Sequence, residues 1–251
     1  MNATIYWKEA KYEFLKLARM RRYTMSVLAM PLMFDCFFAL AMPASQSFHL
    51  PSYLIATYGT FGVMSACLFG VGANLAYERS LGWLEMKRVS PLSGTAYLAG
   101  KIAANLVFCL AVELSLLLTG VLFGHVKLTF WEAVRITAVL LIGAIPFAAL
   151  GVALGYMVSA SSAPALLNMI NLPMAFCSGL WIPMIFLPPF LHKVALFLPP
   201  YHLSKLALDV IGLGNAPAGA RHWQALAAFT LVFVGLAYWA YERQGTAAEA
   251  R

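Results

Sequence analysis

Charged residues are scarce in this chain of 251 residues. Asp, Glu, Lys and Arg make up 11% of the sequence and hydrophobic residues 62%, whereas soluble domains carry about 25% charged residues. This composition excludes an ordinary soluble domain and indicates a membrane protein with several spans. The net charge of +7 is informative mainly through the positions of the basic residues, because Lys and Arg favour cytoplasmic loops. We expect the lipid bilayer as a partner, and no nucleic acid.

Clusters of reactive or metal-binding side chains are also missing. The five histidines are dispersed, and all four cysteines lie inside apolar runs: Cys36, Cys67, Cys109 and Cys177. We therefore expect no disulfide and no metal site. The run from Gly94 to Lys101 is not a phosphate-binding loop, because five residues instead of four separate its glycines and Ile102 stands where Ser or Thr is needed.

What the sequence does contain is a series of six apolar runs long enough to cross a membrane. They cover about residues 23–42, 52–77, 98–123, 133–158, 165–183 and 223–241. The second run is rich in small residues, and Gly151 and Gly155 lie one helical turn apart in the fourth, so both runs should pack closely against other helices. The sequence predicts an all-α polytopic membrane protein with one six-span domain over residues 23–251.

Residues 1–22 precede the first span and hold six basic residues against two acidic ones. On a helical wheel one arc is mostly apolar: Tyr6, Trp7, Ala10, Phe14, Leu17 and Ala18. The other arc is charged: Lys8, Glu9, Glu13, Lys16 and Arg19. This pattern predicts an amphipathic interfacial helix on the cytoplasmic leaflet, with its lysines toward anionic headgroups or a partner. The alternative is a solvated basic leader that only fixes the topology.

Six spans place both termini on one side of the membrane. If that side is the cytoplasm, the inner segments carry 12 basic residues: six in the leader, Arg79, Lys87, Arg88 and Lys101, and two in the tail. The outer segments then carry 5. This asymmetry predicts cytoplasmic termini.

Two acidic residues lie inside predicted spans. Asp35 is near the middle of the first span and Glu113 is slightly beyond the centre of the third. A carboxylate at this depth costs roughly 2.5–3.5 kcal/mol on insertion scales, so each side chain should face protein or water. They are either hydrogen-bonded packing residues or the proton-coupling groups of a secondary transporter.

The stretch from Asn168 to His202 begins as a span and does not continue as one. Its asparagines and the Ser178-Gly179 pair are costly in lipid, and five prolines interrupt the second half: Pro183, Pro188, Pro189, Pro199 and Pro200. The remaining residues there are largely apolar. This predicts a re-entrant helical segment between the fifth and sixth spans, with an apolar loop lying on neighbouring helices as the alternative.

Two motifs make the chain resemble the membrane subunit of a type-2 ABC exporter, the permease family of small drug and antibiotic exporters. The first motif joins the second and third spans: Glu78, Arg79, Gly82, Leu84, Glu85, Ser90, Pro91, Gly100 and Lys101. The second lies in the broken stretch: Leu172, Pro173, Ser178, Gly179, Pro183, Pro188, Pro199 and His202. The chain departs from the family at Trp83, where Thr is common.

The resemblance implies a homodimer or paired permease in a bacterial inner membrane, with a nucleotide-binding ATPase subunit that carries ATP and Mg docked beneath each copy. The leader and one loop would contact the ATPase, through Glu78, Arg79, Gly82, Trp83, Glu85, Pro91 and Lys101. The second and fifth spans would line the substrate route, through Phe61, Met64, Leu68, Asn168, Asn171 and Phe176. The broken segment would form an external gate, with Ser178, Gly179, Pro183, Pro188, Pro199 and His202. Its substrate would be a hydrophobic or amphipathic drug, antibiotic or lipid.

An intramembrane enzyme is the alternative from another class. Ser178 with His192 or His202 could supply a nucleophile and a base, but Ser178 lacks the preceding glycine of a nucleophile elbow. We therefore expect a transport subunit without catalytic residues.

Overall fold

The computed structural model describes residues 3–20, 50–83, 94–122, 126–214 and 219–249, together with Met25, Ala29, Met33 and Met86. All secondary structure in this part of the chain is helical, as predicted. The predicted first span, with Asp35, lies outside the described residues apart from the three isolated positions. Glu85 and Pro91 lie outside them as well.

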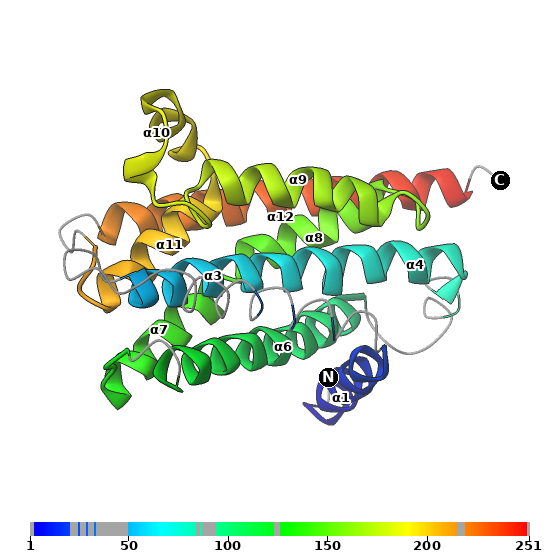
Figure 1. Ribbon diagram of the computed structural model, residues 1–251. Coiled ribbons are helices and arrows are strands. Elements are labelled where there is room, and N and C mark those ends of the chain that lie inside the picture. Colours follow the sequence, from blue (N-terminus) through cyan, green and yellow to red (C-terminus); the bar gives the residue numbers. More distant parts are fainter. Residues whose placement is uncertain are drawn as a thin grey trace.

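Four of the predicted spans correspond to helices that are long and apolar enough to cross a membrane. The second consists of α3 (Leu50–Cys67), a π-helical turn η1 (Leu68–Ala73) and α4 (Asn74–Ser80). The third is α6 (Gly94–Leu122), the fourth is α7 (Phe130–Ile142) followed by α8 (Ile145–Met157), and the sixth is α12 (Gly219–Glu249). Figure 1 shows these helices running side by side, with α4 and the end of α12 at one end of the bundle and α7 at the other.

The fifth predicted span is shorter than expected. The helix α9 covers Ala163–Cys177 and does not reach residue 183. It ends in a Schellman motif, in which Leu180 donates to the carbonyl of Ala175 and Gly179 donates to that of Phe176. Gly179 has φ +73°, a left-handed conformation that favours glycine. Three short helices follow: η2 (Met184–Phe186), α10 (Pro189–Ala195) and α11 (Pro199–Val210).

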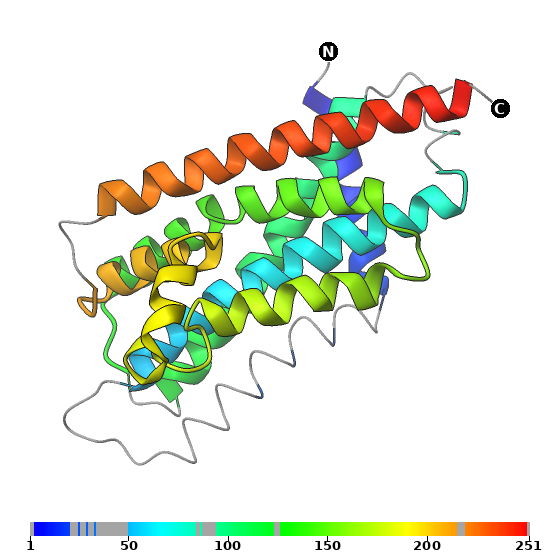
Figure 2. The same ribbon diagram turned by 90° about the horizontal axis from the view of Figure 1, so that it is seen from above.

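The helix α3 lies at the centre of the bundle. It contacts α6, α7, α8, α9 and α11, and Figure 2 shows it between α9 and the α6 and α8 helices. Its large side chains are almost fully buried, whereas α12 exposes residues such as Leu231 and Val232. This difference is expected when α12 faces lipid and α3 forms the core of the chain.

Glycines allow η1 and α8 to touch through their backbones. A Cβ atom on Gly151 would lie 2.7 Å from the carbonyl oxygen of Cys67, and one on Gly72 would lie 2.9 Å from that of Gly151. On Gly155 it would lie 2.8 Å from the carbonyl oxygen of Gly72. The close packing predicted from Gly151 and Gly155 is therefore confirmed, and its partner is the π-helical turn of the second span.

The leader forms a helix, α1 (Ala3–Arg19), but its faces are not arranged as predicted. α1 packs against α6 and buries Leu17 beside Ala104 and Phe108. Glu13, which the helical wheel places on the water-facing arc, is buried, while Trp7 from the apolar arc is 73% exposed. The reason is that Glu13 has charged partners on the spans, which a helical wheel cannot show.

Candidate functional site

Four charged side chains and one tyrosine meet where α1, α4 and α6 come together. The Lys101 ammonium lies 3.1 Å from a carboxylate oxygen of Glu13 and 3.0 Å from one of Glu78. Lys16 donates to Glu13 over 2.6 Å and also to Glu78. The Tyr97 hydroxyl donates to Glu78. We call these five residues the ion cluster; it ties the leader to the ends of the second and third spans.

The ion cluster is buried and balanced in charge. The Lys101 side chain is 0% exposed and those of Glu13 and Glu78 are 5–6% exposed, and two carboxylates face two ammonium groups. Burial alone lowers the pKa of Lys16, but the carboxylates of Glu78 and Glu13 outweigh it and the net shift is upward. Removing one member of such a group leaves its partners as buried, uncompensated charges, which costs roughly 3–5 kcal/mol.

Arg79 makes a second connection from α4. Its guanidinium donates to the carbonyl oxygens of Gly155 and Tyr156, both over 2.6 Å, and to that of Val158 over 3.3 Å. These carbonyls belong to the C-terminal turn of α8. The carbonyl oxygens of such a turn have no hydrogen-bond partners within their own helix and carry partial negative charge. Glu78 and Arg79, adjacent in sequence, therefore bind different parts of the chain.

Beyond these contacts the end of α4 forms an exposed apolar tip. Tyr77, Leu81, Trp83 and Met86 are all at least half exposed. Gly82 has φ +71°, and among the described residues no heavy atom lies within 4 Å of a would-be Cβ. Within this part of the chain, only its backbone conformation calls for glycine. The predicted coupling residues thus divide into two groups: Glu78, Arg79 and Lys101 are bound within the chain, and Gly82 and Trp83 are available to a partner.

The residues predicted to line the substrate route do not lie on one common surface. Three of them are buried in the chain's own core: Phe61, Met64 and Leu68. Asn171 is also buried and donates to the Ser65 hydroxyl over 3.0 Å, which holds α9 against α3. Asn168 and Phe176 are exposed in the part of the chain that the structure describes. Any route between two copies would therefore be lined by the exposed side of α9.

The predicted gate residues are held to the second span near its beginning. The Tyr53 hydroxyl donates to the carbonyl oxygen of Gly179 over 2.6 Å, and Trp181 packs edge-on against Phe61 with ring centroids 5.4 Å apart. Ser178 is buried, and its hydroxyl has no hydrogen-bond partner among the described residues. No histidine contact to Ser178 is found there, so the arrangement does not form the nucleophile and base of a hydrolase.

The prolines of this segment separate its short helices. Pro183 and Pro188 immediately precede η2 and α10, and Pro199 begins α11, where the missing N–H of proline costs no helical hydrogen bond. His202 then anchors α11. One ring nitrogen lies 2.9 Å from the Leu196 carbonyl oxygen and the other lies 2.9 Å from a ring nitrogen of His222 on α12.

Glu113 is fully buried in the membrane-spanning part of α6. Its carboxyl oxygens have no hydrogen-bond partner among the described residues, and a Cβ atom on Gly59 would lie 2.5 Å from one of them. An unpaired charge is strongly disfavoured in such a site. Among the described residues no group of three or more His, Cys, Asp and Glu side chains could hold a metal ion.

The prediction from sequence missed Glu13, Lys16 and Tyr97. A signal for the first two was present, because Glu13 and Lys16 have the i, i+3 spacing of a helical ion pair. Lys101 at the start of an apolar span also required a buried counter-charge. Which carboxylates would provide it depends on how α1 crosses α6, and this is not encoded in local spacing.

Two comparisons with known proteins identify what the chain is similar to. A family model described as "ABC-2 family transporter protein" matches residues 15–239. The chain is also 24% identical over 241 residues to a protein of Bacillus subtilis (strain 168) named "Putative transport permease YvfS". That match covers 94% of this chain and 97% of the relative, so the similarity extends from α1 to α12.

Proposed function

Because the chain belongs to the ABC-2 family of transporter proteins, we propose that it is the permease subunit of an ATP-driven exporter. Two copies form a homodimer and move a hydrophobic or amphipathic substrate, such as a drug, an antibiotic or a lipid, out of the cell. ATP and Mg bind to a separate ATPase subunit, and ATP hydrolysis takes place there.

The observation that carries this proposal is the ion cluster directly behind the exposed tip of α4. The ATPase subunit docks on the tip, through Leu81, Trp83 and Met86. Movement of the tip then passes through Glu78 to α1 and α6 and through Arg79 to α8. Because these contacts are buried and charged, the connected helices move as one rigid unit, which suits alternating access.

In this proposal the tip faces the cytoplasm of a bacterial cell. The basic residues of the leader and of the loop after the second span support this orientation. Figure 1 also places α1 and the end of α12 at the same end of the bundle as α4. The segment from Gly179 to His202 then lies at the external end, where it closes the route as a gate.

The substrate route in this proposal runs between two copies along the exposed face of α9. Met169 is 73% exposed and Phe176 41% exposed, and Asn168 lies on the same exposed side. This mixture of apolar surface and one amide suits an amphipathic molecule better than an ion or a sugar.

Co-purification tests the function most simply. The chain is expressed with a soluble ATPase encoded in an adjacent reading frame, and the complex is reconstituted in proteoliposomes. We expect a stable complex whose ATPase activity rises with at least one hydrophobic compound from a drug and antibiotic panel. A chain that binds no such ATPase and still transports substrate would contradict the proposal.

Replacement of Gly82 by leucine is expected to uncouple ATP hydrolysis from transport. A left-handed non-glycine residue costs about 1–2 kcal/mol, so Gly82→Leu changes the direction of the tip. Gly212→Leu is the matched control, because Gly212 has φ +73° and its would-be Cβ also has no described atom within 4 Å. We expect the ratio of transport to ATP hydrolysis to fall at least fivefold in Gly82→Leu and to be unchanged in Gly212→Leu. Equal ratios in the two variants would exclude the tip from coupling.

A proton-coupled secondary transporter, using Asp35 and Glu113, is the second candidate. The buried carboxyl of Glu113, which has no hydrogen-bond partner among the described residues, favours it. The exporter proposal predicts instead that Glu113 is a neutral packing residue. Glu113→Gln should then keep transport within about twofold of wild type with the same pH dependence, since an amide replaces a neutral carboxyl of the same size. Transport assays in proteoliposomes over a pH series test this, and a lost pH dependence would favour the secondary transporter.

A further inference from the structure

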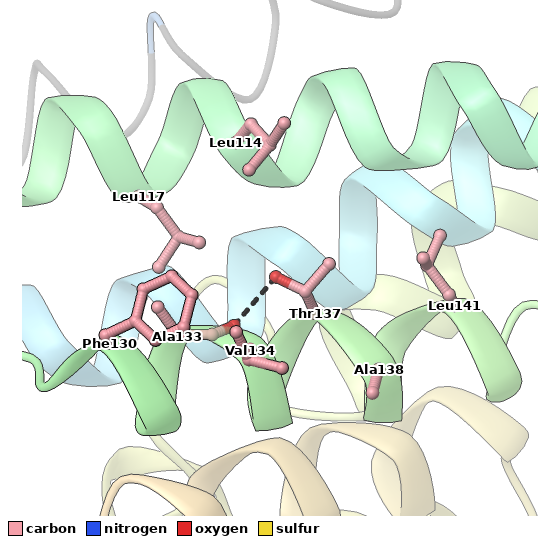
Figure 3. Close-up of a pocket in the computed structure, with 8 residues that line it drawn as sticks. All are labelled: Leu114, Leu117, Phe130, Ala133, Val134, Thr137, Ala138 and Leu141. Carbon is pink, nitrogen blue, oxygen red and sulfur yellow. Dashed lines mark hydrogen bonds between the residues drawn. The ribbon is translucent and has the colours of Figure 1, made fainter.

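A groove of about 340 Å³ lies between α6 and α7, at the end of the bundle opposite the ion cluster. Leu114 and Leu117 of α6 form one wall, and α7 contributes Phe130, Ala133, Thr137 and Leu141. Figure 3 shows the two helices facing one another with these side chains between them. The groove is not part of the functional site described above. The interpretation of the groove does not depend on the proposed transport role.

The groove exists because the side chains in its middle are small. Ala133 and Thr137 lie one turn apart on α7, between the larger Phe130 and Leu141. The end of α7 packs closely against α11, because a Cβ atom on Gly143 would lie 2.2 Å from a methyl carbon of Leu203. α7 is thus held between α6, α3 and α11.

The interior of the groove is apolar. Its one hydroxyl, that of Thr137, donates to the carbonyl oxygen of Ala133 over 2.8 Å within α7, as the dashed line in Figure 3 shows. Both helices belong to candidate membrane spans, so the groove opens into hydrocarbon. A ligand there must be apolar along its length, and the volume lies at the lower end of ligand sites, which span about 300–1,000 Å³.

The rim of the groove has the character of a membrane interface with excess positive charge. Phe130 and Trp131 are 75% and 68% exposed and pack edge to face, as aromatic residues at headgroup depth do. Lys127 and Arg135 are exposed beside them. The nearby carboxylate of Glu132 accepts from the Thr129 amide and hydroxyl in the helix cap. It also interacts with Arg135, so it offsets one of the two positive charges and leaves the other. This arrangement suits an anionic headgroup.

We propose that the groove binds one acyl chain of an anionic phospholipid whose headgroup lies against Lys127 and Arg135. Acyl chains gain little from leaving the surrounding hydrocarbon, so shape and headgroup charge must provide the selectivity. One basic residue near an anionic lipid changes the preference roughly fivefold. The bound lipid fills the space between α6 and α7 and thereby fixes the outer part of the fourth span.

The first test fills the groove. The full chain is purified from nanodiscs that contain equal amounts of phosphatidylglycerol and phosphatidylcholine, and retained lipid is counted by native mass spectrometry. Thr137→Phe should lose the most tightly retained phosphatidylglycerol. Thr230→Phe on α12 is the matched control, because that hydroxyl also donates 2.8 Å to its own helix, to Leu226, and it should retain the lipid. Equal retention in both variants would show bulk annular lipid only and overturn the proposal.

The second test removes the charge. Lys127→Gln with Arg135→Gln should reduce the preference for phosphatidylglycerol over phosphatidylcholine by at least fivefold, while Arg221→Gln at the exposed start of α12 should leave it unchanged. If wild type retains both lipids equally, or if the double variant keeps the wild-type preference for phosphatidylglycerol, the proposal is overturned.

Discussion

Replacing Lys101 by methionine is expected to destabilise the folded chain by roughly 3–5 kcal/mol. The change leaves Glu13 and Glu78 buried with Lys16 as their remaining basic partner in the ion cluster. The free energy of unfolding in detergent micelles measures the loss. Lys193→Met is the control, because Lys193 is exposed on α10, and it should change stability by less than about 0.5 kcal/mol.

A second substitution separates lost charge balance from lost packing. In Glu78→Gln with Lys101→Met the ion cluster is again neutral, with the Glu13–Lys16 pair intact. We expect this double variant to be more stable than the sum of the two single changes predicts, by about 1–3 kcal/mol. Strict additivity would mean that Glu78 and Lys101 do not interact and would remove the basis for treating the ion cluster as one unit.

Adding a single methyl group at Gly151 is expected to have the second largest effect. In Gly151→Ala the new atom would lie 2.7 Å from the Cys67 carbonyl oxygen, so η1 and α8 must separate, at a cost of about 1–3 kcal/mol. Gly235→Ala in α12 is the control, because no atom of the described part of the chain lies within 4 Å of its added atom. There alanine should stabilise the helix by about 0.5–1 kcal/mol. The same unfolding measurement reports both, and a neutral result at Gly151 would contradict the close backbone contact.

The predicted spans that the structure shows as long apolar helices could be found because the sequence signal for a span is local. A run of apolar residues of sufficient length must form a helix in a bilayer, and glycines one turn apart favour close contact. The end of α9 was harder to predict. The span was expected to run to residue 183, yet the helix continues through Pro173 and ends at Cys177. The left-handed conformation of Gly179, which stops it there, is not revealed by any periodicity.

The environments of the candidate functional residues were less predictable because they depend on tertiary contacts. Apolar side chains such as those of Phe61 and Met64 occur in protein cores, on lipid-facing surfaces and along substrate routes. Only the packing of α3 shows that these two lie in the core. Glu13 looked solvated for the same reason, since its partner Lys101 is 88 residues away. The motif around Glu78 could be picked out from the sequence, but its division into an internal cluster and an exposed tip required the structure.

The affinity of the ATPase subunit for the permease tests the central claim most directly. Binding is measured in nanodiscs for wild type, Trp83→Ala at the tip and Trp131→Ala at the opposite end, two tryptophans that are 50% and 68% exposed. Truncating an aromatic residue at the centre of an interface costs about 2 kcal/mol or more, so Trp83→Ala should raise the Kd by more than about tenfold. Trp131→Ala should leave the Kd at its wild-type value. An unchanged Kd in Trp83→Ala, or the same loss in both variants, would contradict docking of the ATPase on the tip of α4.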